Sequence, residues 1–277
     1  MQKEVKEFLD YLLMDKNPRT AYVYVRDLER LLRFCRKPPK ELTVRDISNF
    51  YTFLRERYEY SDRSLNRVGW ALKKYLEFVG EYRLAGMVPR PFYTAKEPKW
   101  IEDESVVMKL VLSPNPRDAA VLGTAYDLAL RAGEVPLLVR EKYNPSTGGI
   151  EVVRLKHKQH PDRYILNVDD WCKKLLNNYI EIADPTSHLF PYSEATVLKI
   201  FRANAERAGL PTTGDNGYTF HCLRHSRITH IAIRELKEKG FVDELSLSKF
   251  AGHLRVETTR LYLHLAAKYL AFGGKHY

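Results

Sequence analysis

The stretch TFHCLRHSR, residues 219–227, places His221 and Arg224 three residues apart, within one turn near the start of a predicted helix. Apolar residues recur at helical spacing beyond it, and the pattern predicts a helix over about His221–Lys239. A histidine and an arginine three residues apart lie on the same face of a helix, so both side chains can reach one ligand. The pair alone is a weak signal, because such spacing also occurs on ordinary solvated helices.

Three further clusters of polar residues strengthen the signal of this stretch. Each has a simple structural explanation by itself: a surface arginine, a solvated hairpin tip or a core tyrosine. All of them fall in the C-terminal two thirds of the chain, and they are LALRAGEVPLL around Arg131, LKHKQHPDR around Lys158 and FAGHLRVETTRLYLH around His253 and Tyr262.

Together the clusters contain the groups that metal-independent cleavage of a DNA phosphodiester requires. The guanidinium forks of Arg131 and Arg224 can hold the non-bridging phosphate oxygens and replace a metal clamp. The Tyr262 hydroxyl can form a phosphotyrosine that keeps the bond energy for rejoining. Its pKa of about 10 in water means that it needs a proton acceptor or an electropositive site. A lysine such as Lys158 can protonate the leaving 5′-oxygen, and imidazoles can assist on either side.

These clusters resemble those of the tyrosine recombinase (phage integrase) family, and the size and layout are closest to its Xer-like site-specific recombinases. The family pattern is an arginine, a hairpin lysine, His-x-x-Arg, Gly-His and a tyrosine nine residues later, and this chain has them in that order. The HCLRH sequence at 221–225 matches the most distinctive box of the family. The resemblance extends over essentially the whole chain.

The resemblance implies a role for each matching residue. Arg131 and Arg224 would bind the scissile phosphate, Lys158 would be the general acid and His221 would accept or position the tyrosine proton. His253 would hydrogen-bond a phosphate oxygen. Tyr262 would attack to form a 3′-phosphotyrosyl bond, and Glu134 would brace the site.

The choice of the catalytic lysine is the weakest of these assignments. The hairpin tip KHKQHPDR holds two lysines, Lys156 and Lys158, and the register of the strands decides between them. Aligning Arg163 with the usual arginine of the family favours Lys158, and Lys156 is the alternative.

Charge and composition fit a DNA-binding protein without requiring one. The 277 residues contain 45 Lys and Arg against 35 Asp and Glu, a net charge of +10, and basic excess favours polyanionic partners. The three cysteines, Cys35, Cys172 and Cys222, form no close pair, so we expect reduced thiols and no disulfide framework. The chain begins without a signal peptide and has no apolar run of membrane-spanning length, so we expect a cytoplasmic protein.

The pattern of apolar residues predicts two domains. Four short amphipathic helices fill residues 1–83, Thr43 is the expected N-cap of the third, and Ser61 or Ser64 opens the fourth. Three prolines follow close together, so we expect a linker over 84–99 and a catalytic domain over 100–277. The fold class expected is mainly α: a small N-terminal helical bundle, SAM-like by resemblance, and a mostly helical C-terminal domain with a small antiparallel β-sheet.

The predicted elements of the second domain place the clusters described above. Two β-rich runs, 149–155 and 163–168, flank the basic tip and predict a hairpin. The helices are expected at about 118–130, 170–183, 194–209, 221–239 and 246–251, with a last stretch from Val256 onward.

The resemblance also implies the partners of the chain. It implies a double-stranded DNA substrate, no cofactor and no metal, and a homotetramer on two DNA sites, with a monomer or dimer as the free form. The C-terminal stripe of Leu265, Tyr269, Leu270 and Phe272 would dock on a neighbouring protomer or fold back on its own domain. DNA-contact candidates, with solvated surface charge as the alternative, are Arg63, Arg67, Lys73, Arg255 and Arg260.

Three other functions remain as alternatives. His221 and His225, at i and i+4, could bind zinc, but no third protein ligand or HExxH pattern accompanies them. A DNA-binding architectural protein would not need this set of residue types. A type IB topoisomerase shares the chemistry and is separated from a recombinase here only by resemblance. The DNA target and the biological task (integration, excision or chromosome-dimer resolution) are not readable from the sequence.

Overall fold

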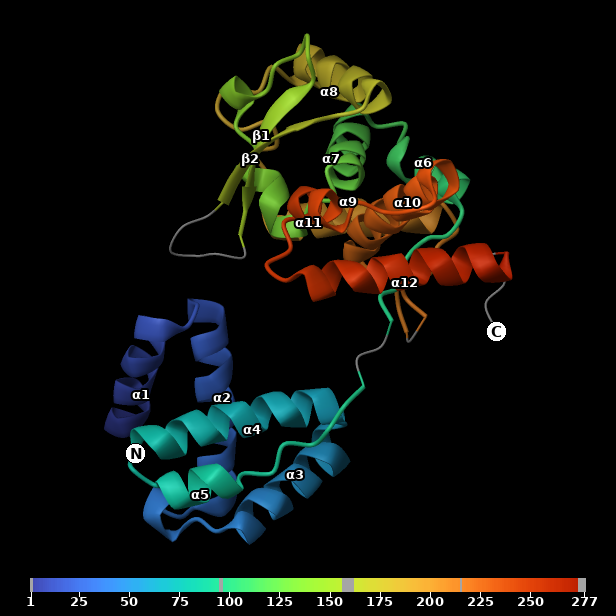
Figure 1. Cartoon of the computed structure of the whole chain (residues 1–277). Coiled ribbons are helices and arrows are strands. Elements are labelled where there is room, and N and C mark those ends of the chain that lie inside the picture. Colours follow the sequence, from blue (N-terminus) through green and yellow to red (C-terminus); the bar gives the residue numbers. More distant parts are fainter. Residues whose placement is uncertain (1, 95–96, 156–161, 215, 274–277) are drawn as a thin grey trace. The chain divides into compact units, whose positions relative to one another are not determined.

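The computed structural model describes residues 2–94, 97–155, 162–214 and 216–273 of the chain. It divides into two compact units, Met1–Lys96 and Glu97–Tyr277, and each unit has its own hydrophobic core. The elements are mostly helical, with one two-stranded antiparallel sheet (Figure 1). The prediction of a mainly helical protein with a small antiparallel sheet is confirmed.

The N-terminal unit is a bundle of helices whose starts are set by local capping. Asn17 caps one helix with Pro18 at its first position, Ser61 caps another, and Thr43 and Asp46 form a reciprocal capping box. The caps expected at Thr43 and at Ser61 are therefore confirmed. The helices are α1 (Gln2–Asp15), α2 (Pro18–Cys35), α3 (Val44–Tyr58), α4 (Asp62–Phe78) and α5 (Tyr82–Met87), with a 3-10 turn, η1 (Pro39–Glu41).

Helix α5 lies where the sequence predicted the start of an extended linker. Its residue Ala85 and the following Val88 are buried in the core of the N-terminal unit. The chain stays attached beyond the helix, because the Tyr51 hydroxyl donates a hydrogen bond of 2.8 Å to the Pro89 carbonyl and Asn66 donates one of 3.0 Å to Pro91. A six-residue helix shows too little periodicity to be predicted and depends on such tertiary contacts.

The C-terminal unit carries all four sequence clusters. Its elements are α6 (Glu104–Val111), α7 (Pro116–Asp127), η2 (Ala132–Leu137), η3 (Arg140–Lys142), β1 (Gly149–Arg154), β2 (Asp162–Asn167), α8 (Asp170–Ala183), α9 (Glu194–Arg207), α10 (His221–Lys239), α11 (Glu244–Ala251) and α12 (Val256–Phe272). All five predicted helices are present, with ends that differ by up to three residues.

Helix α7 forms the centre of this unit, and its residues 119–127 are all buried. It contacts α6, α8, α9 and α10, and α12 packs along α10 and α11 (Figure 1). The helix ends before the predicted Leu130 because Ala129 has a positive φ of 49°, which no α-helix accommodates. Arg131 is thereby placed on the turn that follows the helix.

The strands β1 and β2 form the predicted hairpin, with Gly149 opposite Asn167 and Arg154 opposite Asp162. Alternate residues of β1, namely Ile150, Val152 and Arg154, are buried, as the two-residue period of a strand requires. An arginine thus occupies a position where the strand pattern would place an apolar side chain.

No helix within the described residues combines the length and the apolar character that crossing a bilayer would require.

Candidate active site

Arg131 and Glu134 form the first part of the site, on the turn between α7 and η2. Glu134 is fully buried and accepts two hydrogen bonds from Arg131, one from the backbone N–H at 2.9 Å and one from Nη1 at 2.7 Å. The Arg131 side chain remains 21% exposed. The carboxylate therefore fixes the direction of a guanidinium that still reaches the surface.

Arg224 lies in the first turn of α10 and is 2% exposed. Its Nη1 donates a hydrogen bond of 2.6 Å to the Ala129 carbonyl, and its Nη2 donates one to Ala251, the last residue of α11. A guanidinium has five N–H donors, so these two bonds orient Arg224 and, within the described part of the chain, leave donors for a phosphate. Burial and the nearby charges of Arg131 and Arg154 lower the pKa of Arg224, but a guanidinium remains protonated at neutral pH.

Arg154, which the sequence analysis did not single out, connects the parts of the site. Its Nη1 donates to Glu134 at 2.9 Å, and its Nη2 donates to the carbonyls of Leu128 at 3.0 Å and Phe250 at 2.6 Å. Burial by itself would raise the pKa of Glu134, but the charges of Arg154 and Arg131 and the backbone hydrogen bond outweigh it and lower the pKa. Arg154 thus joins strand β1, the turn after α7 and the end of α11.

His253 follows Gly252, the C-terminal cap of α11, which has a φ of +61°. A Cβ at Gly252 would lie 2.9 Å from the Arg154 Cγ, so both the backbone conformation and the close approach require glycine there. His253 Nδ1 lies 2.9 Å from the Thr259 hydroxyl on α12. The imidazole stacks on the Tyr262 ring at 12° between planes and 5.5 Å between centroids.

Tyr262 lies in the second turn of α12 and is 3% exposed. Burial raises the pKa of its hydroxyl, and the charges of Arg224 and Arg131 act in the opposite direction. Both arginines therefore favour the phenolate, but burial outweighs them and the pKa of Tyr262 stays above its ordinary value. The structure brings Arg131, Glu134, Arg224, His253 and Tyr262 together in one site.

His225 is the second site residue that the sequence analysis did not assign to the reaction. Its Nδ1 lies 2.8 Å from the Tyr262 hydroxyl oxygen, and the two rings stack at 30° and 5.7 Å. Burial, with the charges of His221 and Arg224, lowers the pKa of His225 to about 3, so the imidazole is neutral at physiological pH. The signal in the sequence was its place next to Arg224, one turn beyond His221.

His221 lies at the exposed start of α10, with its ring centroid 5.3 Å from that of His225. Partial burial and the charges of Arg224 and Arg131 lower its pKa. Within the described residues, the side chain at hydrogen-bond distance from the Tyr262 hydroxyl is His225 and not His221.

The predicted general acid Lys158 and its alternative Lys156 lie outside the described residues. The strands on either side of the tip are described, and Arg163, the residue used for the alignment, pairs with Glu151 at 2.8 Å on the solvated side of the hairpin.

The five predicted DNA-contact residues lie in different surroundings. Arg67 pairs with the buried Asp27 at 3.1 Å, and Arg260 pairs with Glu244 at 3.1 Å. Arg63 lies 6.0 Å from the Tyr93 ring centroid and Lys73 lies 5.7 Å from that of Trp70. Arg255 is exposed at the N-cap of α12.

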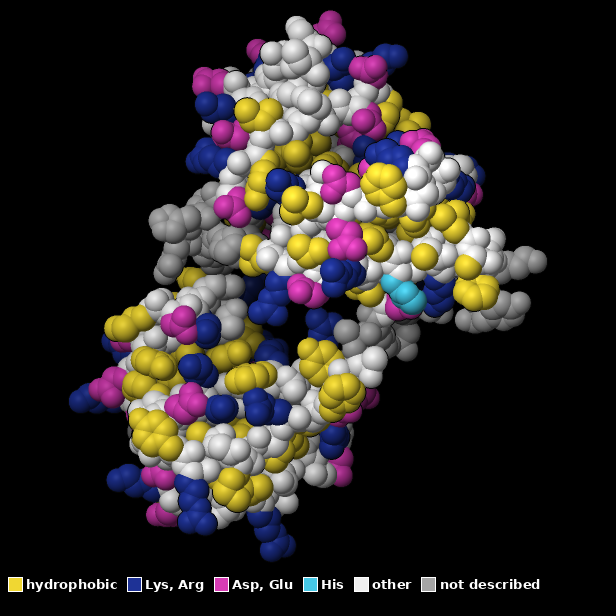
Figure 2. All heavy atoms as spheres, viewed as in Figure 1, with side chains coloured by type: hydrophobic (Ala, Val, Ile, Leu, Met, Phe, Trp, Pro, Cys, Tyr) yellow, Lys and Arg dark blue, Asp and Glu magenta, His cyan; other side chains and the backbone are white. Residues whose placement is uncertain are grey.

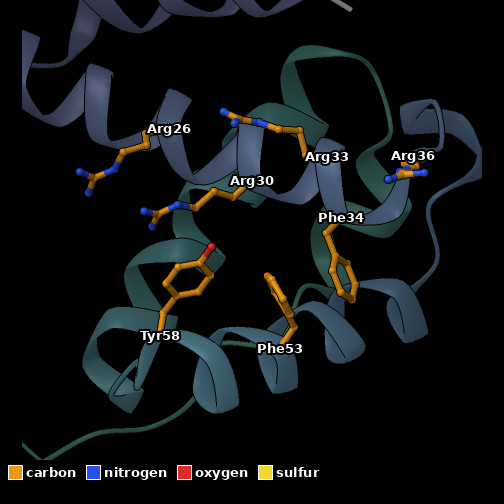
Figure 3. Close-up of a pocket in the computed structure, with 7 residues that line it drawn as sticks. All are labelled: Arg26, Arg30, Arg33, Phe34, Arg36, Phe53 and Tyr58. Atoms are coloured by element: carbon orange, nitrogen blue, oxygen red, sulfur yellow. The ribbon is translucent and has the colours of Figure 1, made fainter.

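A basic pocket in the N-terminal unit adds a second concentration of arginines. It has a volume of about 680 Å³ and lies between α2 and α3 (Figure 3). Figure 2 shows Lys and Arg side chains interspersed with exposed apolar ones over the visible face of this unit. The pocket is lined by Arg26, Arg30, Arg33, Arg36, Phe34, Phe53 and Tyr58.

The charges of this pocket are only partly compensated. Arg33 pairs with Glu29 at 3.2 Å, and the Arg30 guanidinium lies 5.2 Å from the Tyr58 ring centroid. Among the residues that the structure describes, no carboxylate lies within ion-pair distance of Arg26 or Arg36. Concentrated positive charge of this kind attracts anions.

Among the described residues, no group of three His, Cys, Asp or Glu side chains could hold a metal ion. His225, one of the two histidines considered for zinc, instead contacts the Tyr262 hydroxyl.

Comparison with known protein families matches both units of the chain. Residues 4–79 match the phage integrase N-terminal SAM-like domain, and residues 103–268, well over half of the chain, match the phage integrase family. The tyrosine recombinase XerA of Pyrococcus furiosus is 28% identical, with 96% of this chain and 91% of that protein covered. The tyrosine recombinase XerC of Pseudomonas fluorescens is 24% identical, with coverage of 98% and 94%.

Solved structures show the same fold. The XerH site-specific recombinase bound to a palindromic difH substrate, in a post-cleavage complex, has a TM-score of 0.72 at 14% identity, with 98% of this chain and 94% of that chain covered. The lambda integrase tetramer bound to a Holliday junction has a TM-score of 0.71 at 14% identity, with coverage of 94% and 76%. The family match, the relatives of similar length and the shared fold agree: the chain belongs to the phage integrase family and is a Xer-like tyrosine recombinase, an enzyme of site-specific DNA recombination.

Proposed function

We propose that Tyr262 is the nucleophile of strand cleavage and that Arg131 and Arg224 bind the scissile phosphate. The observation that carries the proposal is that Arg224 bonds both the turn that leads to Arg131, at the Ala129 carbonyl, and the end of α11 at Ala251, two residues before the His253 that stacks on Tyr262. A guanidinium pair neutralises the charge that the transition state spreads over the non-bridging oxygens.

The proposed reaction is a transesterification. The Tyr262 oxygen bonds to phosphorus at the 3′ side while the bond to the 5′-oxygen breaks, and the 5′-oxygen takes a proton from Lys158. His253 hydrogen-bonds a phosphate oxygen during this step. A 5′-hydroxyl of another strand then attacks the phosphotyrosine and releases Tyr262, so no cofactor has to supply energy.

Glu134 is proposed as the brace of the phosphate-binding site. Its two hydrogen bonds to Arg131 fix the turn that carries this arginine, and its ion pair with Arg154 holds the same turn to the hairpin. A charged group held by several bonds loses less entropy when it binds a phosphate.

Both units contribute to the proposed binding of double-stranded DNA. Arg26 and Arg36 supply uncompensated charge from the pocket of the N-terminal unit, and Arg63, Lys73 and Arg255 are further candidates for phosphate contacts. Arg67, Lys73 and Arg260 already have carboxylate partners, which for Lys73 is Glu77 at 3.8 Å, so we expect weaker contributions from them.

A homotetramer on two DNA sites is the proposed active assembly, and the similar fold of the lambda integrase tetramer on a Holliday junction supports it. The C-terminal stripe divides into two parts. Leu265 is buried and Tyr269 packs edge-on against Trp100 at 5.5 Å, so these residues fold back on their own unit. Leu270 and Phe272 are exposed, and they are proposed to contact a neighbouring protomer.

Covalent trapping tests the proposed nucleophile. The substrate is a DNA duplex that the protein selects from a random-sequence pool, nicked near the cleavage point so that the 5′-hydroxyl fragment diffuses away. We expect a protein–DNA adduct that resists denaturation and is lost in Tyr262→Phe, while DNA binding persists. Binding without an adduct in the unmodified protein, or an adduct in Tyr262→Phe, would refute the assignment.

The same selected sequence addresses the biological task. The full-length match to Xer recombinases favours chromosome-dimer resolution over integration or excision of an element. A single chromosomal copy of the selected sequence would agree with this proposal, whereas copies at the ends of a mobile element would contradict it.

A further inference from the structure

The Tyr262 hydroxyl contacts a part-buried imidazole, that of His225, the last residue of the HCLRH box and one to which the resemblance assigns no role. The oxygen lies 2.8 Å from His225 Nδ1, which is normal hydrogen-bond length. The Tyr262 ring contacts two imidazoles, with centroid distances of 5.7 Å to His225 and 5.5 Å to His253. The hydroxyl is thus held in one direction before a substrate arrives.

The 2.8 Å contact fits either tautomer of His225, and a role as proton acceptor requires one of them. A phenol has one proton to donate, and Nδ1 can accept it only when the ring proton is on Nε2. Burial together with the charges of His221 and Arg224 keeps the ring neutral, so the Nδ1 lone pair is available at physiological pH. Such a ring is a poor final holder of a proton, because an imidazolium there would be part-buried and close to the Arg224 charge.

His221 is a second imidazole close to His225 and could accept a proton from it. Its ring centroid lies 5.3 Å from that of His225, one helical turn away on α10, and it is exposed to solvent. The rings meet edge-to-face with no hydrogen bond between them among the described contacts, so a proton that leaves His225 through Nε2 would reach this accessible imidazole by way of solvent.

We propose that His225 takes the hydroxyl proton of Tyr262 and passes a proton on to His221, so that the two imidazoles form a relay from the buried nucleophile to solvent. The proposal rests on Tyr262 being the nucleophile. It makes His225 a catalytic residue, because it contacts the reacting oxygen, and it gives His221 an indirect role.

The proton transfers balance without leaving a charge on the part-buried His225 ring. As the Tyr262 oxygen bonds to phosphorus, its hydrogen moves to His225 Nδ1, and the hydrogen on Nε2 moves through a solvent molecule to His221. His225 ends neutral as the other tautomer, and His221 releases its extra proton to water. The bond from phosphorus to the 5′-oxygen breaks in the same step, and that oxygen is protonated separately by the proposed Lys158.

Single-turnover cleavage of the selected, nicked duplex tests the relay. His225→Ala removes the acceptor, and His225→Asn places an amide oxygen near the Nδ1 position that can accept a hydrogen bond but cannot carry a proton onward. His264→Ala is the matched control, because this histidine is exposed on α12 two residues from Tyr262. We expect a rate loss of about 10²- to 10⁴-fold in His225→Ala and none in His264→Ala.

Three further measurements separate proton transfer from damage to the fold. The Asn variant should regain rate as pH rises, because hydroxide replaces the lost acceptor, and added imidazole should restore part of the rate of His225→Ala. The variant that combines His221→Ala with His225→Ala should be no slower than His225→Ala alone, since both residues act in one path.

A duplex with a bridging 5′-sulfur at the cleavage point distinguishes protonation of the leaving group from removal of the Tyr262 proton, because a thiolate leaves without protonation. This substrate should restore cleavage by Lys158→Ala but not by His225→Ala. The relay is overturned if the His225 variants cleave at the rate of His264→Ala, or if the sulfur substrate rescues them. It is also overturned if the two histidine substitutions have additive effects. If instead the unmodified protein forms no adduct at all, the proposed nucleophile is wrong.

Discussion

Replacing Glu134 by alanine should destabilise the C-terminal unit far more than removing another carboxylate of the same hairpin region. Glu134 is fully buried against Arg154, whose side chain is 2% exposed. Glu151 pairs with Arg163 at a similar distance, 2.8 Å, but the Arg163 side chain is 62% exposed. The two pairs therefore differ mainly in their access to water.

The magnitudes follow from this difference. Breaking a buried ion pair by removing one partner costs about 3–5 kcal/mol, because a charge is left without compensation in a low-dielectric site. An exposed pair contributes roughly 0–1 kcal/mol. We expect the free energy of unfolding to fall by about 3–5 kcal/mol in Glu134→Ala and by at most about 1 kcal/mol in Glu151→Ala.

Denaturant unfolding followed by tryptophan fluorescence measures the difference. The three tryptophans are Trp70, Trp100 and Trp171, so a Trp70→Phe background leaves a signal from the C-terminal unit alone. Separate transitions of the two units would otherwise be mixed. Equal losses in Glu134→Ala and Glu151→Ala would refute the reasoning.

The pH dependence supplies a second check on Glu134. Its pKa is lowered in the folded protein, so its contribution to stability is present above the unfolded pKa, about 4.3 for glutamate. That contribution is lost as the pH falls through the folded pKa. We expect the gap in stability between the unmodified protein and Glu134→Ala to be constant near neutral pH and to narrow only in acid.

Two other predictions concern a glycine of the site and the basic pocket. Gly252→Ala should lower the free energy of unfolding by about 2–4 kcal/mol, because a left-handed residue with a Cβ costs roughly 1–2 kcal/mol and the new atom also meets Arg154 Cγ at 2.9 Å. Gly240 has a φ of +78° and open space around it, so Gly240→Ala should cost only the roughly 1–2 kcal/mol of the left-handed backbone. Equal losses of stability in the two variants would contradict the steric argument. Arg26→Gln should lower the slope of log affinity for DNA against log salt by about 0.9, as expected for one lost phosphate contact. The Arg33 guanidinium already pairs with a carboxylate, so Arg33→Gln should change the slope less. DNA-binding titrations at several salt concentrations measure both slopes. An unchanged slope in Arg26→Gln would show that the pocket is not part of the DNA interface.

Elements with local signals could be predicted from the sequence. Thr43 and Asp46 form a capping box within four residues, and the alternating run of β1 has a two-residue period, so both were recognisable without tertiary information. The early end of α7 was not, because nothing near Ala129 in the sequence signals its positive φ. The carbonyl of Ala129 accepts from Arg224, 95 residues away, which is the kind of contact that sets such a turn.

The residues of the site also fall into those that could be predicted from the sequence and those that could not. Arg131, Arg224, His253 and Tyr262 were found because their types and spacing matched a known pattern. Arg154 could not be found, because its partners Leu128, Glu134 and Phe250 lie 20 to 96 residues away and a buried arginine breaks the apolar rule of its strand. His225 was visible in the sequence, but only the packing of α12 on α10 shows that it, and not His221, meets the Tyr262 hydroxyl.

The contacts around the site separate phosphate binding from delivery of the nucleophile. Arg131, Arg154 and Arg224 are oriented by Glu134 and by carbonyls of the turn after α7 and of α11, and none of the hydrogen bonds described for them involves α12. Tyr262 is instead held by His225 and by the burial of its own helix against α10 and α11. Within the described residues, the three arginines therefore do not depend on the position of the tyrosine, whereas His253, which contacts Thr259 and stacks on Tyr262, does. Displacing α12 would remove the attacking oxygen while leaving the guanidiniums in place, so binding and cleavage respond to different parts of the fold.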